Sequence, residues 1–256
     1  MSTGNPLSKK ESANRQLTLN FPAQPQYRFS NFVQFQGSRI AFEAANEICS
    51  GDPAPYNTLF ISGEKGLGKT HLLISIGNEI AENSPDKKAL YIRCEDFIHN
   101  IDNEEESSDP KSFKQLAEVD YFLMDDVDRI CGHKKAQEKL YYIYNEVTGR
   151  DGKMVFSGRK NPDQLSATES FLRSRFKWGM TAEIQKMDDA ASAQLIKKLC
   201  RDMELDVPDN ISAYLLNRIP RDYPSLKNAV TKINQESLTR KRKVTLPLVK
   251  EALGLQ

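Results

Sequence analysis

The chain has 256 residues, enough to bury a sizeable core in one large domain or in a larger and a smaller one. Hydrophobic residues make up 39% and charged residues 28%, an ordinary globular composition, and the formal net charge is +1. A nearly neutral chain lacks the overall basic charge typical of duplex-DNA binders, although a local patch stays open. No apolar run is long enough to span a membrane and the start lacks an apolar signal core, so we expect a cytoplasmic protein without a membrane partner.

Residues 1–26 are polar and rich in Ser, Asn, Gln, Lys and Pro, a composition that predicts a disordered tail. One stretch differs, because Gln16-Leu17-Thr18-Leu19-Asn20-Phe21 alternates polar and apolar residues as an extended strand does. Pro22 ends this stretch.

Strand-like and helix-like segments alternate over residues 27–186, which predicts an α/β domain with a parallel sheet covered by helices. The segment Tyr121–Met124 is fully apolar, as is typical of a central parallel strand. The expected strands are residues 57–62, 89–94, 121–124, 154–156 and 180–184, and helical spacing is found at 70–82 and 137–147.

Strand-like segments stop after Lys186, so we expect residues 187–256 to form a small all-helical domain. Asp188 or Asp189 is suited to cap its first helix, and Pro208 is suited to a first helical turn. Further helical segments are expected at residues 211–219, 225–240 and 247–253.

A glycine-rich loop follows the first expected strand. Its sequence is Gly63-Glu64-Lys65-Gly66-Leu67-Gly68-Lys69-Thr70, which matches the P-loop pattern GxxxxGK[ST] at every fixed position. The glycines let backbone N–H groups wrap the phosphates, Lys69 reaches the β and γ phosphates, and the Thr70 hydroxyl ligates Mg²⁺. The preceding apolar strand and the following amphipathic helix argue against a chance glycine turn.

Two aspartates end the apolar segment Tyr121–Met124. In P-loop proteins an aspartate at this place holds the Mg²⁺ ion, so we assign Asp125 to the metal and Asp126 to orienting or activating water. The alternative is a pair of surface acids in a turn.

Three blocks of the chain resemble the DnaA/Hda family of bacterial AAA+ replication-initiation proteins. The blocks are Tyr27-Arg28-Phe29-Ser30-Asn31-Phe32-Val33, Gly66-Leu67-Gly68-Lys69-Thr70-His71-Leu72-Leu73 and Ser174-Arg175-Phe176-Lys177-Trp178-Gly179. The resemblance covers residues 27–253 and implies a P-loop AAA+ core with a five-stranded parallel sheet flanked by helices, followed by a helical lid.

The resemblance also implies roles for particular residues. Phe32 and Val33 lie near the adenine, and Arg175 is an arginine finger that contacts the γ-phosphate held by a neighbouring subunit, unless it is only part of a surface ion pair. His71 is expected to pack or cap within the helix after the P-loop, and Trp178 to lie in the core. The implied nucleotide-binding set for ATP or ADP is Phe32, Val33, Gly63, Gly66, Leu67, Gly68, Lys69, Thr70 and His71.

Some features depart from the initiator pattern. Few residues follow Leu253, so we do not expect direct recognition of duplex DNA, and the acids at 104–106 would repel single-stranded DNA. Gly158 stands where the initiator has an acidic residue, and Pro224 stands where its lid arginine would align, with Arg221 three residues away. These changes leave intrinsic ATP hydrolysis open.

The tail stretch is similar to peptides that dock on the bacterial sliding clamp. In that mode the Gln16 amide forms hydrogen bonds while Leu19 and Phe21 fill an apolar pocket, and Leu17 belongs to the same peptide. The alternative is a stray strand whose apolar residues pack on the core.

The layout of tail, core and lid resembles the Hda branch of the family, whose members inactivate DnaA. We therefore expect an ATP- or ADP-binding regulator that contacts DnaA and the sliding clamp, forms homo-oligomers, and promotes hydrolysis of DnaA-bound ATP more than that of its own. Two alternatives stay open: a stand-alone ATPase on single-stranded DNA, and a recruitment module with a structural nucleotide.

Overall fold

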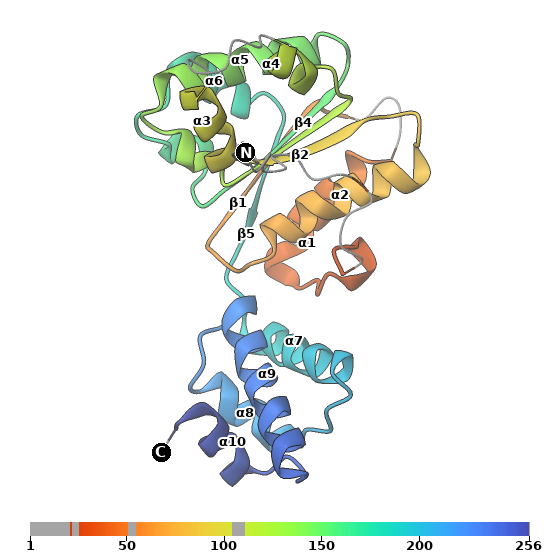
Figure 1. Ribbon diagram of the computed structural model, residues 1–256, viewed down its shortest axis with the longest axis vertical. Coiled ribbons are helices and arrows are strands. Elements are labelled where there is room, and N and C mark those ends of the chain that lie inside the picture. Colours follow the sequence, from red (N-terminus) through yellow and green to blue (C-terminus); the bar gives the residue numbers. More distant parts are fainter. Residues whose placement is uncertain (1–20, 22–25, 51–54, 104–110, 256) are drawn as a thin grey trace, which may run out of the picture.

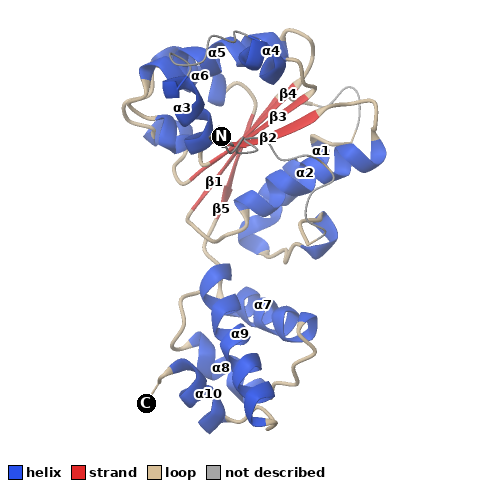
Figure 2. Ribbon diagram, in the orientation of Figure 1, coloured by secondary structure: helices blue, strands red, loops and turns tan. Residues whose placement is uncertain are grey.

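The computed structural model describes residue 21 and residues 26–50, 55–103 and 111–255. Most of the expected tail and the acidic residues 104–106 therefore lie outside the described residues. Figure 1 shows a sheet with helices on both faces above a separate group of helices that ends the chain. In Figure 2 the strands gather in the upper part and the lower part is helical.

The sheet has five parallel strands in the order β2-β3-β4-β1-β5, which confirms the predicted fold class. Its strands are β1 (Thr58–Gly63), β2 (Ala89–Arg93), β3 (Tyr121–Asp125), β4 (Lys153–Gly158) and β5 (Met180–Ile184). β1 lies between β4 and β5. After β1 the chain passes through the P-loop, and the next strand, β2, lies at the far edge of the sheet. In such sheets ligands bind outside the carboxyl ends of the strands, near this reversal of order.

Helices cover both faces of the sheet because its strands alternate side chains between two cores. Phe122 and Met124 of β3 belong to one cluster, while Tyr121 and Leu123 belong to the other. α1 (Arg39–Glu47) and α2 (Lys69–Asn83) pack on the second cluster. The first cluster is covered by α3 (Cys94–Asn103), α4 (Lys111–Ala117), α5 (Lys134–Thr148) and α6 (Ser170–Phe176).

Short 3₁₀ turns connect several of these elements. They are η1 (Phe29–Asn31), η2 (Gln36–Ser38), η3 (Val127–Ile130) and η4 (Pro162–Gln164).

The helical part after β5 has its own apolar cluster, centred on residues such as Leu195, Ile196, Leu226 and Val230. Its helices are α7 (Asp189–Asp202), α8 (Asp209–Leu216), α9 (Tyr223–Arg240) and α10 (Leu246–Leu253). The Asp188 side chain accepts a hydrogen bond from Ala191 N at 2.7 Å and so caps α7, as the sequence predicts. None of the described helices is long and apolar enough to cross a bilayer.

The link between α6 and β5 gives a test of packing against β1. A Cβ added at Gly179 would lie 2.0 Å from the carbonyl oxygen of Thr58 in β1, and a backbone atom cannot rotate away. We therefore expect Gly179→Ala to lower the free energy of unfolding by about 3 kcal/mol in urea denaturation.

Gly132→Ala is the matched control, because no described atom lies within 4 Å of an added Cβ there and only its φ of +83° opposes the change. That backbone strain costs about 1–2 kcal/mol. Equal losses in the two variants would contradict the packing argument.

Candidate functional site

The P-loop connects the buried strand β1 to the first turn of α2. Gly66 has a φ of +82° and Gly68 a φ of +98°, in the left-handed region that favours glycine. α2 begins at Lys69, directly after Gly68, so its N-terminal N–H groups and their partial positive charge face the loop. The local geometry is therefore suited to an anion.

Lys69 is buried beneath this loop, with 5% of its surface exposed. Its Nζ donates hydrogen bonds to the carbonyl oxygens of Gly63 at 2.7 Å and Glu64 at 2.8 Å. Burial lowers the pKa of Lys69, while the charges of Asp126 and Asp125 act in the opposite direction. The ammonium is thus tethered to the loop that would hold a polyphosphate.

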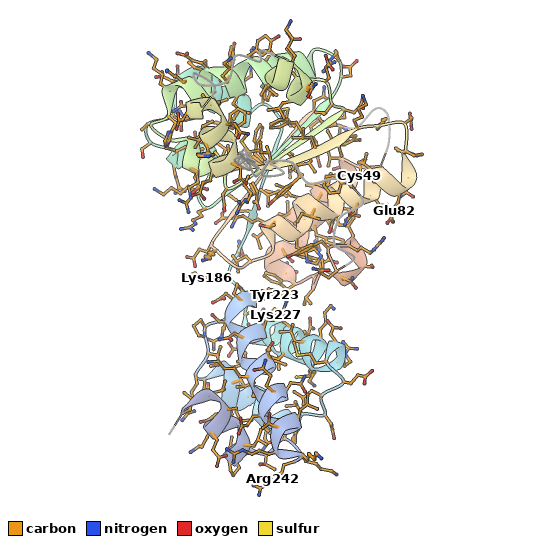
Figure 3. All side chains as sticks on the ribbon, in the orientation of Figure 1. Cys49, Glu82, Lys186, Tyr223, Lys227 and Arg242 are labelled. Atoms are coloured by element: carbon orange, nitrogen blue, oxygen red, sulfur yellow. The ribbon has the colours of Figure 1, made fainter. Side chains whose placement is uncertain are left out.

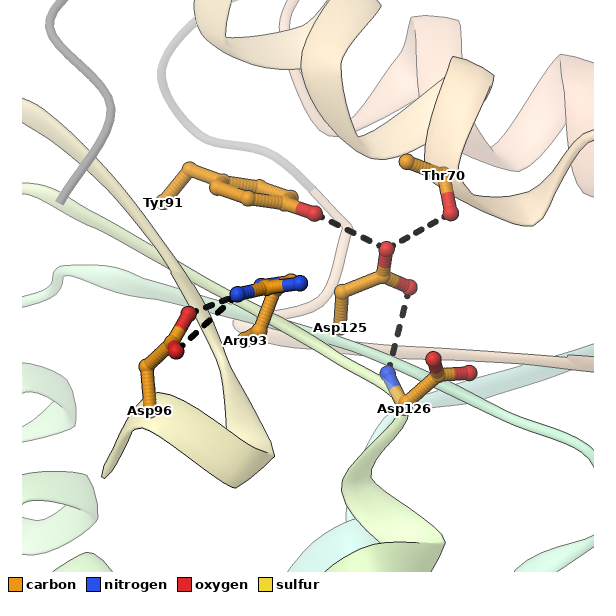
Figure 4. A network of polar contacts seen from close by, with 6 residues as sticks. All are labelled: Thr70, Tyr91, Arg93, Asp96, Asp125 and Asp126. Carbon is orange, nitrogen blue, oxygen red and sulfur yellow. Dashed lines mark hydrogen bonds and ion pairs between the residues drawn. The ribbon is translucent and has the colours of Figure 1, made fainter. Parts of the chain in front are cut away.

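Asp125 is the centre of a hydrogen-bond network, part of which Figure 4 shows. Its Oδ2 accepts from the Thr70 hydroxyl at 2.6 Å and from the Tyr91 hydroxyl at 2.9 Å. Its Oδ1 accepts from the Ser157 hydroxyl and from the backbone N–H of Asp126. The carboxylate is 3% exposed, so these donors offset the cost of burying it.

Tyr91 and Ser157 were not among the residues that sequence patterns selected. They reach Asp125 because β2 and β4 flank β3 in the sheet, which brings the carboxyl ends of the three strands together. Ser157 directly follows an expected strand, whereas Tyr91 lies inside one, so its place in the sequence gives no signal of this contact.

Asp126 follows at a backbone position with a φ of +53°. Burial, then the charges of Asp125 and Asp128, raise the pKa of its carboxyl group, while Lys69 and Arg159 act against them. Asp128 contributes a further carboxylate beside Gly158, because a Cβ there would lie 3.2 Å from Asp128 Oδ1. The same oxygen accepts from the backbone N–H of Arg159 at 2.8 Å.

The donor set is compatible with Mg²⁺ bound together with a nucleotide. Thr70 and Asp125 place a hydroxyl and a carboxylate oxygen side by side, and Mg²⁺ prefers oxygen ligands. Among the described residues no group of three or more His, Cys, Asp or Glu side chains could hold a metal ion. Mg²⁺ sites of P-loop proteins use one or two protein oxygens and complete their coordination with phosphates and water, so the two observations agree.

Aromatic residues next to the P-loop are held by the segment before α1. A Cβ on Gly68 would lie 2.7 Å from Phe32 Cε2, so the Phe32 ring covers the end of the loop. The His71 ring contacts Phe32 edge to face at 5.3 Å, and His71 Nε2 lies 2.9 Å from the carbonyl oxygen of Arg28. Burial lowers the pKa of His71. His71 thus fixes the segment that carries Phe32 and Val33.

The helical part touches the P-loop through backbone atoms. The N–H of Tyr223, the first residue of α9, donates to the carbonyl oxygen of Gly66 at 3.1 Å. A Cβ at Gly66 would lie 2.8 Å from Pro224 Cδ. Arg221 instead forms an ion pair with Asp189 of α7 at 2.6 Å. In Figure 3, Lys186 and Tyr223 lie where the two parts of the chain meet.

Arg175 and Phe21 lie elsewhere on the molecule. Arg175 belongs to α6, which covers the sheet face opposite α2, and its guanidinium carbon lies 4.2 Å from the centre of the Trp178 ring. Phe21 packs on the cluster beneath α2, where its ring occupies the space next to Gly77. The other residues of the candidate clamp peptide, Gln16, Leu17 and Leu19, lie outside the described residues.

The fold and site define a class of protein, a P-loop nucleotide-binding domain of the AAA+ type followed by a helical lid. Comparison with known families identifies it further. Residues 23–183 match the bacterial DnaA ATPase domain, and residues 188–253 match the Hda lid domain.

Solved structures agree with these matches. Domain III of the Thermotoga maritima replication initiation protein DnaA is 30% identical, with a TM-score of 0.85 over 91% of this chain and 98% of that one. The initiator DnaA bound to AMPPCP and single-stranded DNA is 26% identical, with a TM-score of 0.77 over 85% and 68%. AMPPCP-bound DnaA from Aquifex aeolicus is 25% identical, with a TM-score of 0.76 over 85% and 70%.

The chain therefore belongs to the DnaA/Hda family of AAA+ proteins, and it is a DnaA/Hda-like regulator of replication.

The phosphate cradle leads to a prediction about Lys69. Replacing it with alanine removes the buried ammonium, so we expect Lys69→Ala to weaken ATP and ADP binding by roughly 100-fold or more in calorimetry. Lys65→Ala is the control, because Lys65 is exposed at a variable position of the same loop. Unchanged affinity in Lys69→Ala, or equal losses in both variants, would contradict the assignment.

Proposed function

We propose that the chain is a nucleotide-dependent regulator that binds DnaA and promotes hydrolysis of the ATP that DnaA holds. Its own nucleotide binds between the P-loop and α9, with Mg²⁺ held by Thr70 and Asp125. When bound, the metal neutralises charge on the phosphates. The N-terminal peptide tethers the protein to the sliding clamp, and Arg175 completes the ATP site of the bound DnaA.

The observation that carries this proposal is the separation of Arg175 from the chain's own P-loop. The P-loop follows β1 and leads into α2, whereas α6 packs with α5 on the opposite face of the sheet. An arginine so placed is suited to act on a second subunit, and a cation supplied in trans stabilises the charge that develops during phosphoryl transfer. Two copies of this chain could associate in the same way, with the α6 side of one copy against the P-loop side of the other. We therefore also expect homo-oligomers.

The residues of the chain's own site have distinct tasks in this proposal. Lys69 and the backbone N–H groups of the P-loop bind the polyphosphate, while Phe32 and Val33 border the base. Asp126 orients water, and the raised pKa of its carboxyl group suits a group that accepts a proton. Because the backbone of Tyr223 contacts Gly66, the bound phosphates influence the angle of the lid.

The tether rests on the peptide Gln16–Phe21, of which only Phe21 is described. Phe21 packs beside Gly77, so clamp binding has to lift the ring from that place. Binding would then exchange one apolar contact for another, and Gln16, Leu17 and Leu19 supply the remaining contacts.

A second function is favoured by the lid geometry. Position 224 holds a proline that packs on Gly66, and the nearby Arg221 is paired with Asp189. Neither position therefore supplies an arginine like the one in the lid of the initiator. This arrangement suits a recruitment module whose nucleotide is structural. Purified protein that carries stoichiometric ADP and shows negligible turnover would favour this second function.

The finger assignment predicts the behaviour of Arg175→Ala. We expect this variant to lose stimulation of DnaA-bound ATP hydrolysis by about 10³-fold, because the trans cation is missing. Single-turnover hydrolysis of ATP preloaded on DnaA measures the effect, and calorimetry on the variant checks that its own nucleotide site is intact. Arg173→Ala, on the same helix, is the control. Normal stimulation by Arg175→Ala would contradict the assignment of Arg175 as an arginine finger.

The tether predicts the outcome of a clamp pull-down. The double variant Gln16→Ala with Leu19→Ala should lose clamp binding, since it removes the amide and one apolar anchor. Thr18→Ala is the matched control, because it lies between these positions and, in an extended peptide, points to the side opposite the apolar residues Leu17, Leu19 and Phe21. Retained binding by the double variant would exclude this peptide as the tether.

A further inference from the structure

The guanidinium of Arg175 is surrounded by aromatic rings. Its Cζ lies 4.2 Å from the ring centre of Trp178, 5.5 Å from that of Tyr141 and 5.7 Å from that of Tyr144. The tyrosines come from α5, and Trp178 follows the end of α6. All three distances are within the range of a cation–π interaction.

No acidic side chain balances this cation among the described residues. Arg175 has no ion pair in that part of the chain, and its buried Nε lacks a hydrogen-bond partner there. Guanidinium groups usually pair with carboxylates or phosphates through parallel hydrogen bonds. The buried Nε is out of reach, but the arrangement leaves the other guanidinium nitrogens without a carboxylate partner in the described residues, so they can pair with an anion from outside the chain.

The three rings differ in how they are held. Tyr144 is buried and its hydroxyl lies 2.7 Å from the hydroxyl oxygen of Thr58, while Tyr141 packs edge to face on Phe171 at 4.9 Å. Trp178 is 67% exposed, which makes the expectation that it lies in the core wrong. Its ring therefore stacks on the guanidinium from an exposed position, unlike the buried ring of Tyr144.

We propose that Trp178 is a positioning residue that holds Arg175 ready for the phosphate of a nucleotide bound to a second AAA+ subunit. This inference rests on the proposed finger role of Arg175. A free arginine side chain samples many rotamers, and ordering it on docking weakens the contact. Stacking on Trp178 orders the guanidinium before the partner binds, so docking loses less side-chain entropy.

The activity test compares three replacements of Trp178 in single-turnover hydrolysis of DnaA-bound ATP. Trp178→Ala should lower the maximal stimulated rate about tenfold, since it removes the cation–π contact. Trp178→Phe should restore most of the rate because it keeps an aromatic face. Trp178→Leu should stay low because it has apolar bulk without that face. Urea denaturation midpoints confirm that the variants are folded.

A second readout uses the fact that Trp178 is the only tryptophan in the sequence. Its fluorescence in the free chain therefore reports the stack directly. Arg175→Met should change the emission maximum or intensity, and denaturant should abolish the difference between variant and parent. Lys177→Met, which changes a neighbouring cation, should leave the emission close to that of the parent.

The outcomes separate the positioning role from the finger role. If Arg175→Ala abolishes stimulation while Trp178→Ala retains it in full, the positioning role of Trp178 is overturned and the finger role of Arg175 is kept. If Trp178→Leu stimulates as well as Trp178→Phe, or if Arg175→Met leaves the emission unchanged, the stacking argument is overturned. If Arg175→Ala stimulates normally, the proposed function fails, and the positioning role with it.

Discussion

The hydrogen bond from the Thr70 hydroxyl to the Asp125 carboxylate joins the first turn of α2 to the carboxyl end of β3. A buried carboxylate is costly unless donors surround it, and Tyr91, Ser157 and the N–H of Asp126 supply the others. Strands β2, β3 and β4 are thereby tied to the helix that starts at the P-loop. The two groups that we propose as Mg²⁺ ligands, the Thr70 hydroxyl and the Asp125 carboxylate, are thus held side by side by one hydrogen-bond network.

The lid is coupled to this centre through the backbone. Tyr223 N–H contacts the Gly66 carbonyl, and Pro224 fills the space that a side chain at residue 66 would need. A backbone contact of this kind does not depend on the charge of any lid side chain. The uncharged Pro224 therefore still seats the lid on the loop.

Much of the fold could be predicted from the sequence, because its strands are short apolar runs bounded by turns. Tyr121–Met124 and the P-loop match strong patterns, and the lid helices carry recognisable caps such as Asp188. The sequence did not reveal α1, α3, α4 and α6, which are 7 to 10 residues long and lie among irregular segments. Cys94, expected to end a strand, begins α3.

Within the candidate site, residues in motifs could be found and residues that depend on strand order could not. Nothing local in the sequence says that Tyr91 stands beside Asp125, because that neighbourhood follows from β2 pairing with β3. Trp178 was misplaced for another reason. Its apolar character suggests burial, whereas its position over a cation explains why a large ring stays exposed. The roles assigned to individual site residues remain predictions.

Two consecutive residues before α1 face different parts of the molecule. Phe32 packs with the cluster beneath α2, and Val33 packs with the cluster of the lid helices. One peptide bond thus joins a residue of the core cluster to a residue of the lid cluster. If the N-terminal tail is tethered as we propose, a pull on it would act on the packing of both parts of the chain at once.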